Sequence, residues 1–122
     1  MKKQVVAILI VSLVLFSVNA FANKTSVTIE GPESAVKGSE VTIKINVRHD
    51  GNNFFHYTNQ VYVKANGKEI ARWDFSATSR PENEVFTKEV KLTITEPTEI
   101  AAEGVCNIHG SDGPAVLKIR VE

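Results

Sequence analysis

Four side chains in this sequence carry the atoms that transition metals prefer as protein ligands. The segment 106–110 reads CNIHG and contains the only cysteine, Cys106, and one of the three histidines, His109. The other two histidines, His49 and His56, flank an earlier polar segment. Thiolate sulfur and imidazole nitrogen are competent ligands for iron, copper and zinc. We therefore predict that these four residues bind one metal ion, with Cys106 and His109 carrying its reactivity.

Each of these residues also has an ordinary structural explanation. A lone cysteine can be a buried apolar residue, although Asn107 and Gly110 indicate a turn at this point rather than core. His49 and His109 can be solvated loop residues, and His56, between two aromatic residues, can pack against the core. All four explanations would have to hold at once, whereas a single metal site accounts for the whole set.

The first 22 residues have the composition of a secretory signal peptide. Lys2 and Lys3 give a positive start, residues 5–18 are apolar except for two serines, and residues 20–22 (AFA) match a small-x-small cleavage site. The apolar run is shorter than the roughly 20 residues that a membrane-spanning helix needs. We predict cleavage after Ala22, a periplasmic or secreted protein, and no membrane attachment after cleavage.

The predicted mature chain, residues 23–122, has the size of one domain. Without Lys2 and Lys3 it contains 12 basic and 14 acidic side chains, a net charge of −2. This balance lacks the basic stripe of a nucleic-acid-binding protein, so no nucleic-acid partner is expected. A single cysteine cannot form an internal disulfide, and a thiol in an oxidising compartment is open to oxidation unless it is buried or bound. The sequence leaves the oligomeric state open, including a homo-oligomer.

Short alternating segments predict the elements that position the four residues. Residues 41–47 alternate apolar and polar side chains, which is typical of a strand with one buried face. Asn66-Gly67 predicts a tight hairpin turn, and the strand after it offers Ile70, Trp73 and Phe75 to the core. Strands are also predicted at 26–30, 57–65, 68–75, 85–95, 99–105 and 115–122, with a polar turn at 34–40.

These strands predict an all-β protein, because no segment shows helical periodicity over ten residues. Short strands separated by turns every 8–12 residues are typical of an immunoglobulin-like antiparallel β-sandwich, here of about seven strands. A sandwich gathers its loops at its two ends. The four predicted ligands meet if their two loops lie at the same end.

Several segments resemble one known family. HY (56–57), QVYV (60–63), NGK (66–68) and AR (71–72) resemble the central part of the superoxide reductases, the desulfoferrodoxin and neelaredoxin family. The CNIHG segment is similar to the C-terminal iron-binding motif of that family. His49 lies where the family places a histidine upstream of its His-Tyr pair.

The resemblance implies an immunoglobulin-like sandwich that binds one iron ion. His49, His56 and His109 would be equatorial ligands, and Cys106 the axial ligand opposite a site that opens for superoxide. The implied reaction is the one-electron reduction of superoxide to hydrogen peroxide, with iron cycling between its ferrous and ferric forms. A separate electron-donor protein would reduce the iron again.

The sequence departs from the family pattern in two places. The family usually has a Glu-Lys-His-x-Pro element near the N-terminus that supplies a fourth equatorial histidine, whereas this chain has no histidine before His49. Water, another ligand or an open position would then take its place. Ser111-Asp112 follow the motif where the family has bulky apolar residues, which implies a more exposed site. The two-cysteine-pair domain that holds a second iron in some relatives has no counterpart here, so one mononuclear site is expected.

Two other functions fit the same residues. A cupredoxin-like electron carrier also binds copper through cysteine and histidine on a β-sandwich, but it usually adds an axial methionine, and the only methionine here is Met1. A non-catalytic metal-binding module of the same fold is the other alternative. A positive rim would favour superoxide capture, and Arg48, Lys64 and Arg72 are the cations available for it, although ordinary surface roles also explain them.

Overall fold

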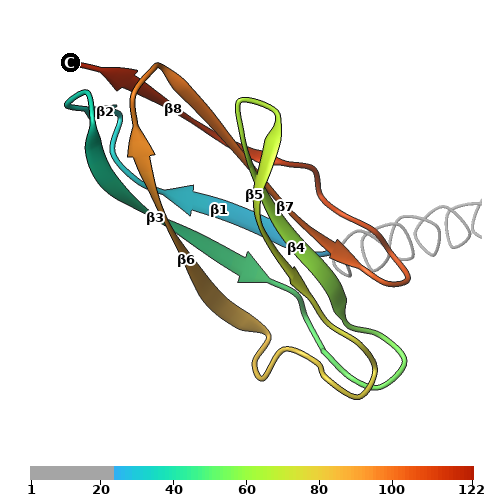
Figure 1. Ribbon diagram of the computed structural model, residues 1–122. Coiled ribbons are helices and arrows are strands. Elements are labelled where there is room, and N and C mark those ends of the chain that lie inside the picture. The colour runs from blue at the N-terminus through green and yellow to red at the C-terminus, as the bar shows by residue number, and fades with distance from the viewer. Residues whose placement is uncertain (1–23) are drawn as a thin grey trace, which may run out of the picture.

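The computed structural model describes residues 24–122, so the predicted signal peptide lies outside the described residues. The described chain folds into eight strands without a helix, and none of it could cross a membrane as a helix (Figure 1). The strands are β1 (Ser26–Glu30), β2 (Ser34–Ala35), β3 (Ser39–Arg48), β4 (Thr58–Ala65), β5 (Lys68–Asp74), β6 (Val85–Ile94), β7 (Thr98–Cys106) and β8 (Ala115–Val121).

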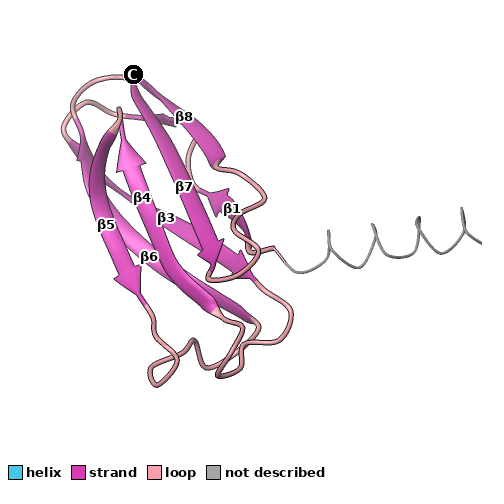
Figure 2. Cartoon of the chain, turned by 90° about the vertical axis from the view of Figure 1, so that its right-hand side faces the viewer, coloured by secondary structure: helices cyan, strands magenta, loops and turns pink. Residues whose placement is uncertain are grey.

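The strands form two sheets that pack face to face, with loops gathered at the ends of the layers (Figure 2). One sheet has the order β1-β3-β6 and the other the order β2-β8-β7-β4-β5. All pairs are antiparallel except β2 with β8. The predicted all-β sandwich is therefore confirmed, with eight strands instead of about seven.

The core lies between the sheets and follows from the alternation along each strand. Side chains of a strand point to opposite faces in turn, so every second residue is buried. On β3 the buried row contains Ile43, Ile45 and Val47, and on β7 it contains Ile100 and Ala102. These two rows belong to different sheets and contribute to the same apolar cluster.

The two departures from the expected elements have simple causes. β2 lies within the segment 34–40 that was expected to be a turn, and two residues are too few for alternation to be visible in the sequence. The expectation that Ile70 faces the core is wrong, since its exposed fraction is 38%. On β5 it is Ala71 and Trp73 that pack against the core, followed by Phe75 just after the strand, and Ile70 lies on the opposite face.

β1 of one sheet packs on β7 of the other. A Cβ atom at Gly104 would lie 2.6 Å from Cγ2 of Thr25 and 3.2 Å from Cγ1 of Val27. Thr25 is fully buried there, and its hydroxyl group lies 3.0 Å from that of Thr58 on β4. A glycine at position 104 is therefore needed for the two sheets to approach each other beside the loops that carry the predicted ligands.

We predict that Gly104→Ala destabilises the protein by about 1–3 kcal/mol, because buried neighbours must shift to accommodate the methyl group. Gly31→Ala is the matched control. Neither glycine has a positive φ, and a Cβ at Gly31 would come close only to the end of the Leu117 side chain, at 2.8 Å, with Ile43 Cγ1 at an ordinary contact distance of 3.6 Å. That substitution should change the free energy of unfolding by less than about 1 kcal/mol. Urea unfolding of both variants measures the difference, and equal stabilities would contradict the close approach at Gly104.

Candidate metal centre

Two of the predicted ligands continue the buried rows of the core. His49 follows Val47 by two residues, so it extends the inward face of β3 one step beyond the end of the strand, and it is fully buried. Cys106 follows Gly104 by two residues and is the last residue of β7, with 2% of its surface exposed. The expectation that Cys106 lies in a turn is therefore wrong by one residue, because the turn begins after it. The core of the sandwich thus ends in an imidazole from one sheet and a thiol from the other.

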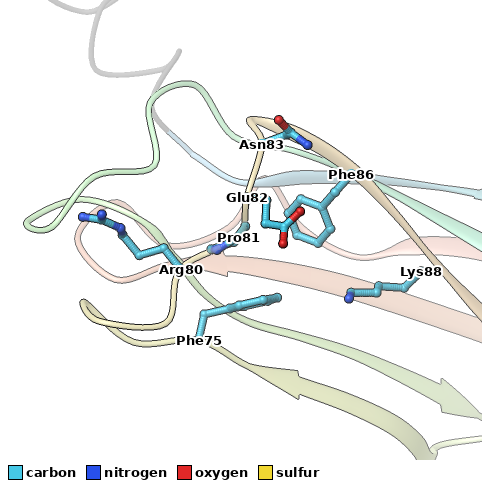
Figure 3. A pocket seen from close by; sticks show the side chains of 7 residues that line it. All are labelled: Phe75, Arg80, Pro81, Glu82, Asn83, Phe86 and Lys88. Carbon is cyan, nitrogen blue, oxygen red and sulfur yellow. The ribbon is translucent and has the colours of Figure 1, made fainter.

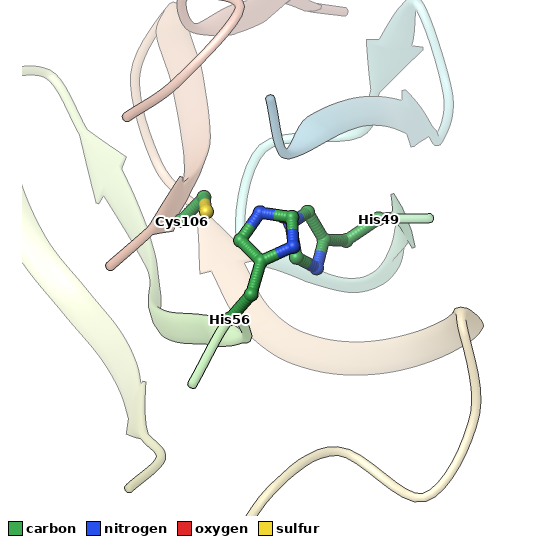
Figure 4. Close-up of side chains that lie close together, drawn as sticks. All are labelled: His49, His56 and Cys106. Atoms are coloured by element: carbon green, nitrogen blue, oxygen red, sulfur yellow. The ribbon is translucent and has the colours of Figure 1, made fainter. Parts of the chain in front are cut away.

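The structure brings all four predicted ligands together at this end of the sandwich. His56 Nε2 lies 3.2 Å from His49 Nε2 and 2.9 Å from His109 Nδ1. The sulfur of Cys106 lies 3.9 Å from His109 Nδ1. The ligand atoms of His49, His56 and Cys106 all lie within 4.8 Å of one another, and Figure 4 shows the two rings and the thiol turned toward a common point.

The distances between the ring nitrogens suit a single metal ion. Nitrogen ligands about 2.1 Å from one ion lie about 3.0 Å apart at a right angle and about 3.4 Å apart at the tetrahedral angle. The two separations that involve His56 Nε2, 3.2 and 2.9 Å, fall near these values. One thiolate and three imidazoles form a donor set suited to iron, copper or zinc. The residues present therefore fit a metal, and the donor set alone does not decide which one.

The predicted ligands differ sharply in exposure. His49 and Cys106 are buried, His56 is half-buried and His109 is exposed. Next to His109, the side chain of Ile108 is 59% exposed. The site is therefore closed by the core on the side of His49 and open to solvent on the side of His109.

The turn that carries His109 is closed by its own backbone. Cys106 N–H donates to Gly110 O at 2.8 Å, and Gly110 N–H donates to Cys106 O at 3.1 Å. Gly110 has a φ of 75°, a left-handed conformation that other residues rarely adopt. Within the turn, the backbone N–H of His109 donates to the sulfur of Cys106 at 3.4 Å. This bond fixes the position of the sulfur relative to the turn that carries His109.

Asn107 joins the two loops that carry the predicted ligands. Its side-chain oxygen accepts from Tyr57 N–H at 2.9 Å, and its side-chain nitrogen donates to Phe55 O at 3.1 Å. Its backbone N–H donates to Tyr57 O at 3.0 Å. These bonds hold the chain on both sides of His56, so they position this ring relative to the Cys106 turn.

Asn53 shapes the loop from within. Its side-chain oxygen accepts from the backbone N–H groups of Phe55 and His56, each at 3.0 Å. Its backbone N–H also donates to His56 O at 2.7 Å. The polar segment before His56 was expected only to be a loop. Its asparagines define the shape of the loop, a role that the residue type allows but composition alone does not reveal.

The start of the described chain also lies at this site. Thr25 N–H donates to Gly110 O at 3.4 Å, and Asp112 N–H donates to Thr25 O at 3.0 Å. Thr25 therefore fastens the N-terminal segment to the turn that carries His109. The sequence has no histidine in that segment, so within the described residues the histidines of the cluster number three.

The cations considered for a positive rim have other contacts. Arg48 pairs with Asp50 at 3.7 Å. Arg72 pairs with Glu69 and Asp74 on β5, and its hydrogen bond to Glu69 raises the pKa of its guanidinium group. The Lys64 ammonium lies 5.5 Å from the centre of the Tyr62 ring. These contacts support the ordinary surface roles of the three cations.

A separate hollow of about 350 Å³ lies between the edges of β5 and β6, beside the loop that joins them (Figure 3). None of the four predicted ligands lines it. Its residues are Phe75, Arg80, Pro81, Glu82, Asn83, Phe86 and Lys88.

We predict that Asn107→Ala lowers the free energy of unfolding by about 1–2 kcal/mol, because two hydrogen bonds between the loops are lost. Asn107→Asp keeps the acceptor for Tyr57 N–H but places a carboxylate oxygen against Phe55 O, so it should restore only part of the stability that the alanine variant loses. Urea unfolding of the metal-free variants tests this order. An alanine variant as stable as the wild type would show that Asn107 does not hold the two loops together.

Comparison with known proteins agrees with this architecture. Residues 17–111 match the Desulfoferrodoxin family model. The superoxide reductase (neelaredoxin) from Ignicoccus hospitalis, as its T24K variant, is similar over 84% of this chain and 85% of its own, with 21% identity and a TM-score of 0.68. A candidate superoxide reductase from Thermotoga maritima shares 24% identity over 80% of this chain and 86% of its own, with a TM-score of 0.59.

A more distant fold relative is the CARDB domain of a Pyrococcus furiosus protein, solved in complex with di-metal ions. It is 16% identical over 82% of this chain and 94% of its own, with a TM-score of 0.60. At these identities the structures establish the fold alone, and no curated protein sequence matches the chain significantly. The family match covers most of the chain and agrees with its superoxide-reductase-like fold, so this chain belongs to the desulfoferrodoxin family of iron-binding proteins.

Proposed function

We propose that this protein is an exported mononuclear non-haem iron protein that reduces superoxide to hydrogen peroxide. His49, His56, His109 and Cys106 would hold the iron. The observation that carries the proposal is the convergence of these donors, with His56 Nε2 within 3.2 Å of two other ring nitrogens and a thiol beside them. The convergence occurs in a chain of the desulfoferrodoxin family.

A ferrous ion bound by this set would supply the one electron with which superoxide, taking up two protons, becomes hydrogen peroxide. The protein's own contribution is to hold the donors and control access. The Cys106 sulfur accepts a hydrogen bond from the His109 N–H group, and as a metal-bound thiolate it would be a strong electron donor to the metal. The open side beside His109 gives a small anion and the protons it needs a path from solvent.

The proposed iron site has three histidines where the family usually has four. Thr25 is fastened beside the His109 turn, but the segment before it contains no histidine. We propose that solvent completes the ligand set at this position. Such a site keeps the thiolate and still offers open positions for a small anion.

The proposed function also requires that the protein is exported and that its iron is reduced again after each reaction. The composition of residues 1–22 supports a cleaved signal peptide, which would make the mature protein periplasmic or secreted. After each turnover the ferric site needs one electron, and we propose that a separate donor protein supplies it.

Metal analysis of the exported protein, purified without oxygen and without added metal, is the first test. We expect about one iron per chain and an intact mass that corresponds to residues 23–122. Such a preparation should consume superoxide with formation of hydrogen peroxide and no dioxygen. Stoichiometric copper would instead support a cupredoxin-like electron carrier. A chain that takes up no metal, even when iron is offered, would end the catalytic proposal and leave a domain that keeps only the fold.

We predict that Cys106→Ser removes the thiolate-to-metal absorption band of the oxidised protein and most of its superoxide consumption. A serine hydroxyl group has nearly the same size but is not deprotonated at neutral pH, so it donates far less electron density. Ser111→Ala, in the same loop, is the control and should keep the band. An unchanged spectrum in Cys106→Ser would refute the assignment of this residue as a ligand.

A further inference from the structure

His49 is the predicted ligand farthest from solvent, and its second ring nitrogen has a defined partner. Nδ1 of His49 lies 2.7 Å from the side-chain oxygen of Asn52. The ring itself is fully buried, and its backbone N–H donates to Glu84 O at 2.8 Å. The imidazole is therefore held at its backbone and at the nitrogen that faces away from the other predicted ligands.

The orientation of the Asn52 amide is set by two backbone groups. Its side-chain oxygen accepts from Thr58 N–H at 3.0 Å, and its side-chain nitrogen donates to Asn83 O at 3.2 Å. A flipped amide would place its NH₂ group against the Thr58 N–H and its oxygen against the Asn83 carbonyl oxygen. Both contacts would be repulsive, so the atom that faces His49 is the oxygen.

An amide oxygen only accepts hydrogen bonds, so the nitrogen opposite it must donate. His49 therefore carries its proton on Nδ1, and Nε2 is left with a free lone pair. That lone pair points toward His56 Nε2, 3.2 Å away, where the predicted ligands converge. In a neutral imidazole the tautomer is decided by such a partner on the other nitrogen.

From this chain of contacts we infer that Asn52 is a positioning residue that sets His49 as a metal ligand before any metal arrives. It selects the Nδ1–H tautomer and fixes the ring plane, so that Nε2 is ready to bind without a proton transfer. Asn52 thus prepares His49 as a ligand in the metal-free protein, and its effect on metal affinity rests on the proposed metal function.

The tautomer is tested in metal-free protein, independently of any metal. Long-range ¹H–¹⁵N spectra of the imidazole rings, recorded at a pH where they are neutral, report which nitrogen carries the proton. The chain has only three histidines, so single His→Gln variants assign each ring. We expect the Nδ1–H form for His49 in the wild type and a shift toward Nε2–H in Asn52→Ala. A wild-type His49 in the Nε2–H form would overturn the inference.

The consequence for metal binding is tested with Co²⁺, whose thiolate charge-transfer band reports occupancy. Loss of a group that orients a ligand typically weakens metal binding about 10- to 100-fold, and we expect this range for Asn52→Ala. Asn52→Asp keeps an oxygen for Thr58 N–H and for His49 Nδ1–H but places its second oxygen against Asn83 O, so it should keep the Nδ1–H tautomer and lose less affinity than Asn52→Ala. It also serves as the second variant if the alanine protein does not fold. Asn83→Ala is the matched control, because Asn83 takes part through its backbone oxygen alone.

The outcomes separate this inference from the proposed function. Unchanged affinity in Asn52→Ala, with the tautomer unchanged, would overturn the role of Asn52 while leaving the metal site intact. Equal loss in Asn52→Asp and Asn52→Ala would also overturn it, because the acceptor oxygen would then be irrelevant. A wild-type protein that binds neither Co²⁺ nor Fe²⁺ would refute the proposed function, and the ring spectra would still decide the tautomer.

Discussion

The site depends on holding side chains from two sheets that share no strand. Backbone pairing fixes residues within each sheet, but no ladder joins β3, which precedes His49, to β7, which ends in Cys106. Their relative position is set by the packing of the two inward rows and by the close contact of Gly104 with Thr25. Small changes in the separation of the layers would move the thiol relative to the buried imidazole. The tight packing at this end of the sandwich is thus a geometric requirement of the site.

Asparagine side chains supply the connections that the backbone cannot. Asn107 links the two loops, Asn53 shapes the turn before His56, and Asn52 holds the inner ring. An amide offers a donor and an acceptor on one short side chain, so it can join backbone groups of opposite kinds without adding charge. Formal charge near a metal would alter its electrostatics as well as its geometry. A neutral amide can position a ligand without changing the charge around the metal.

Much of this structure could be predicted because the relevant information is local. Alternation along β3 gives its buried face, and Asn66-Gly67 marks the hairpin, with a positive φ at both residues. The same alternation, continued by one step to His49, would also have predicted that this histidine points inward. A histidine that continues the two-residue spacing of the buried apolar residues of a strand can therefore be predicted to point into the core.

The features that the sequence did not reveal depend on partners far away in the chain. β2 exists only because β8 is beside it, and the roles of Asn52 and Asn107 depend on groups that a composition pattern cannot bring together. Ile70 is apolar and lies on a strand, yet it faces away from the core. Side chains alternate between the two faces of a strand, and Ala71 and Trp73 occupy the inward face of β5. Each case requires knowledge of which strand or loop lies opposite, and that is a property of the folded chain.

The four predicted ligands differ in how far they lie from solvent, and this difference would decide which of them an incoming ion meets first. His49 is sealed by the core, whereas His109 stands at the surface on a turn of five residues closed by Gly110. In the proposed metal site, an arriving ion would meet the exposed imidazole of His109 before the buried imidazole of His49. The residues that control access to such a site would therefore differ from the residue that anchors the ion in the core.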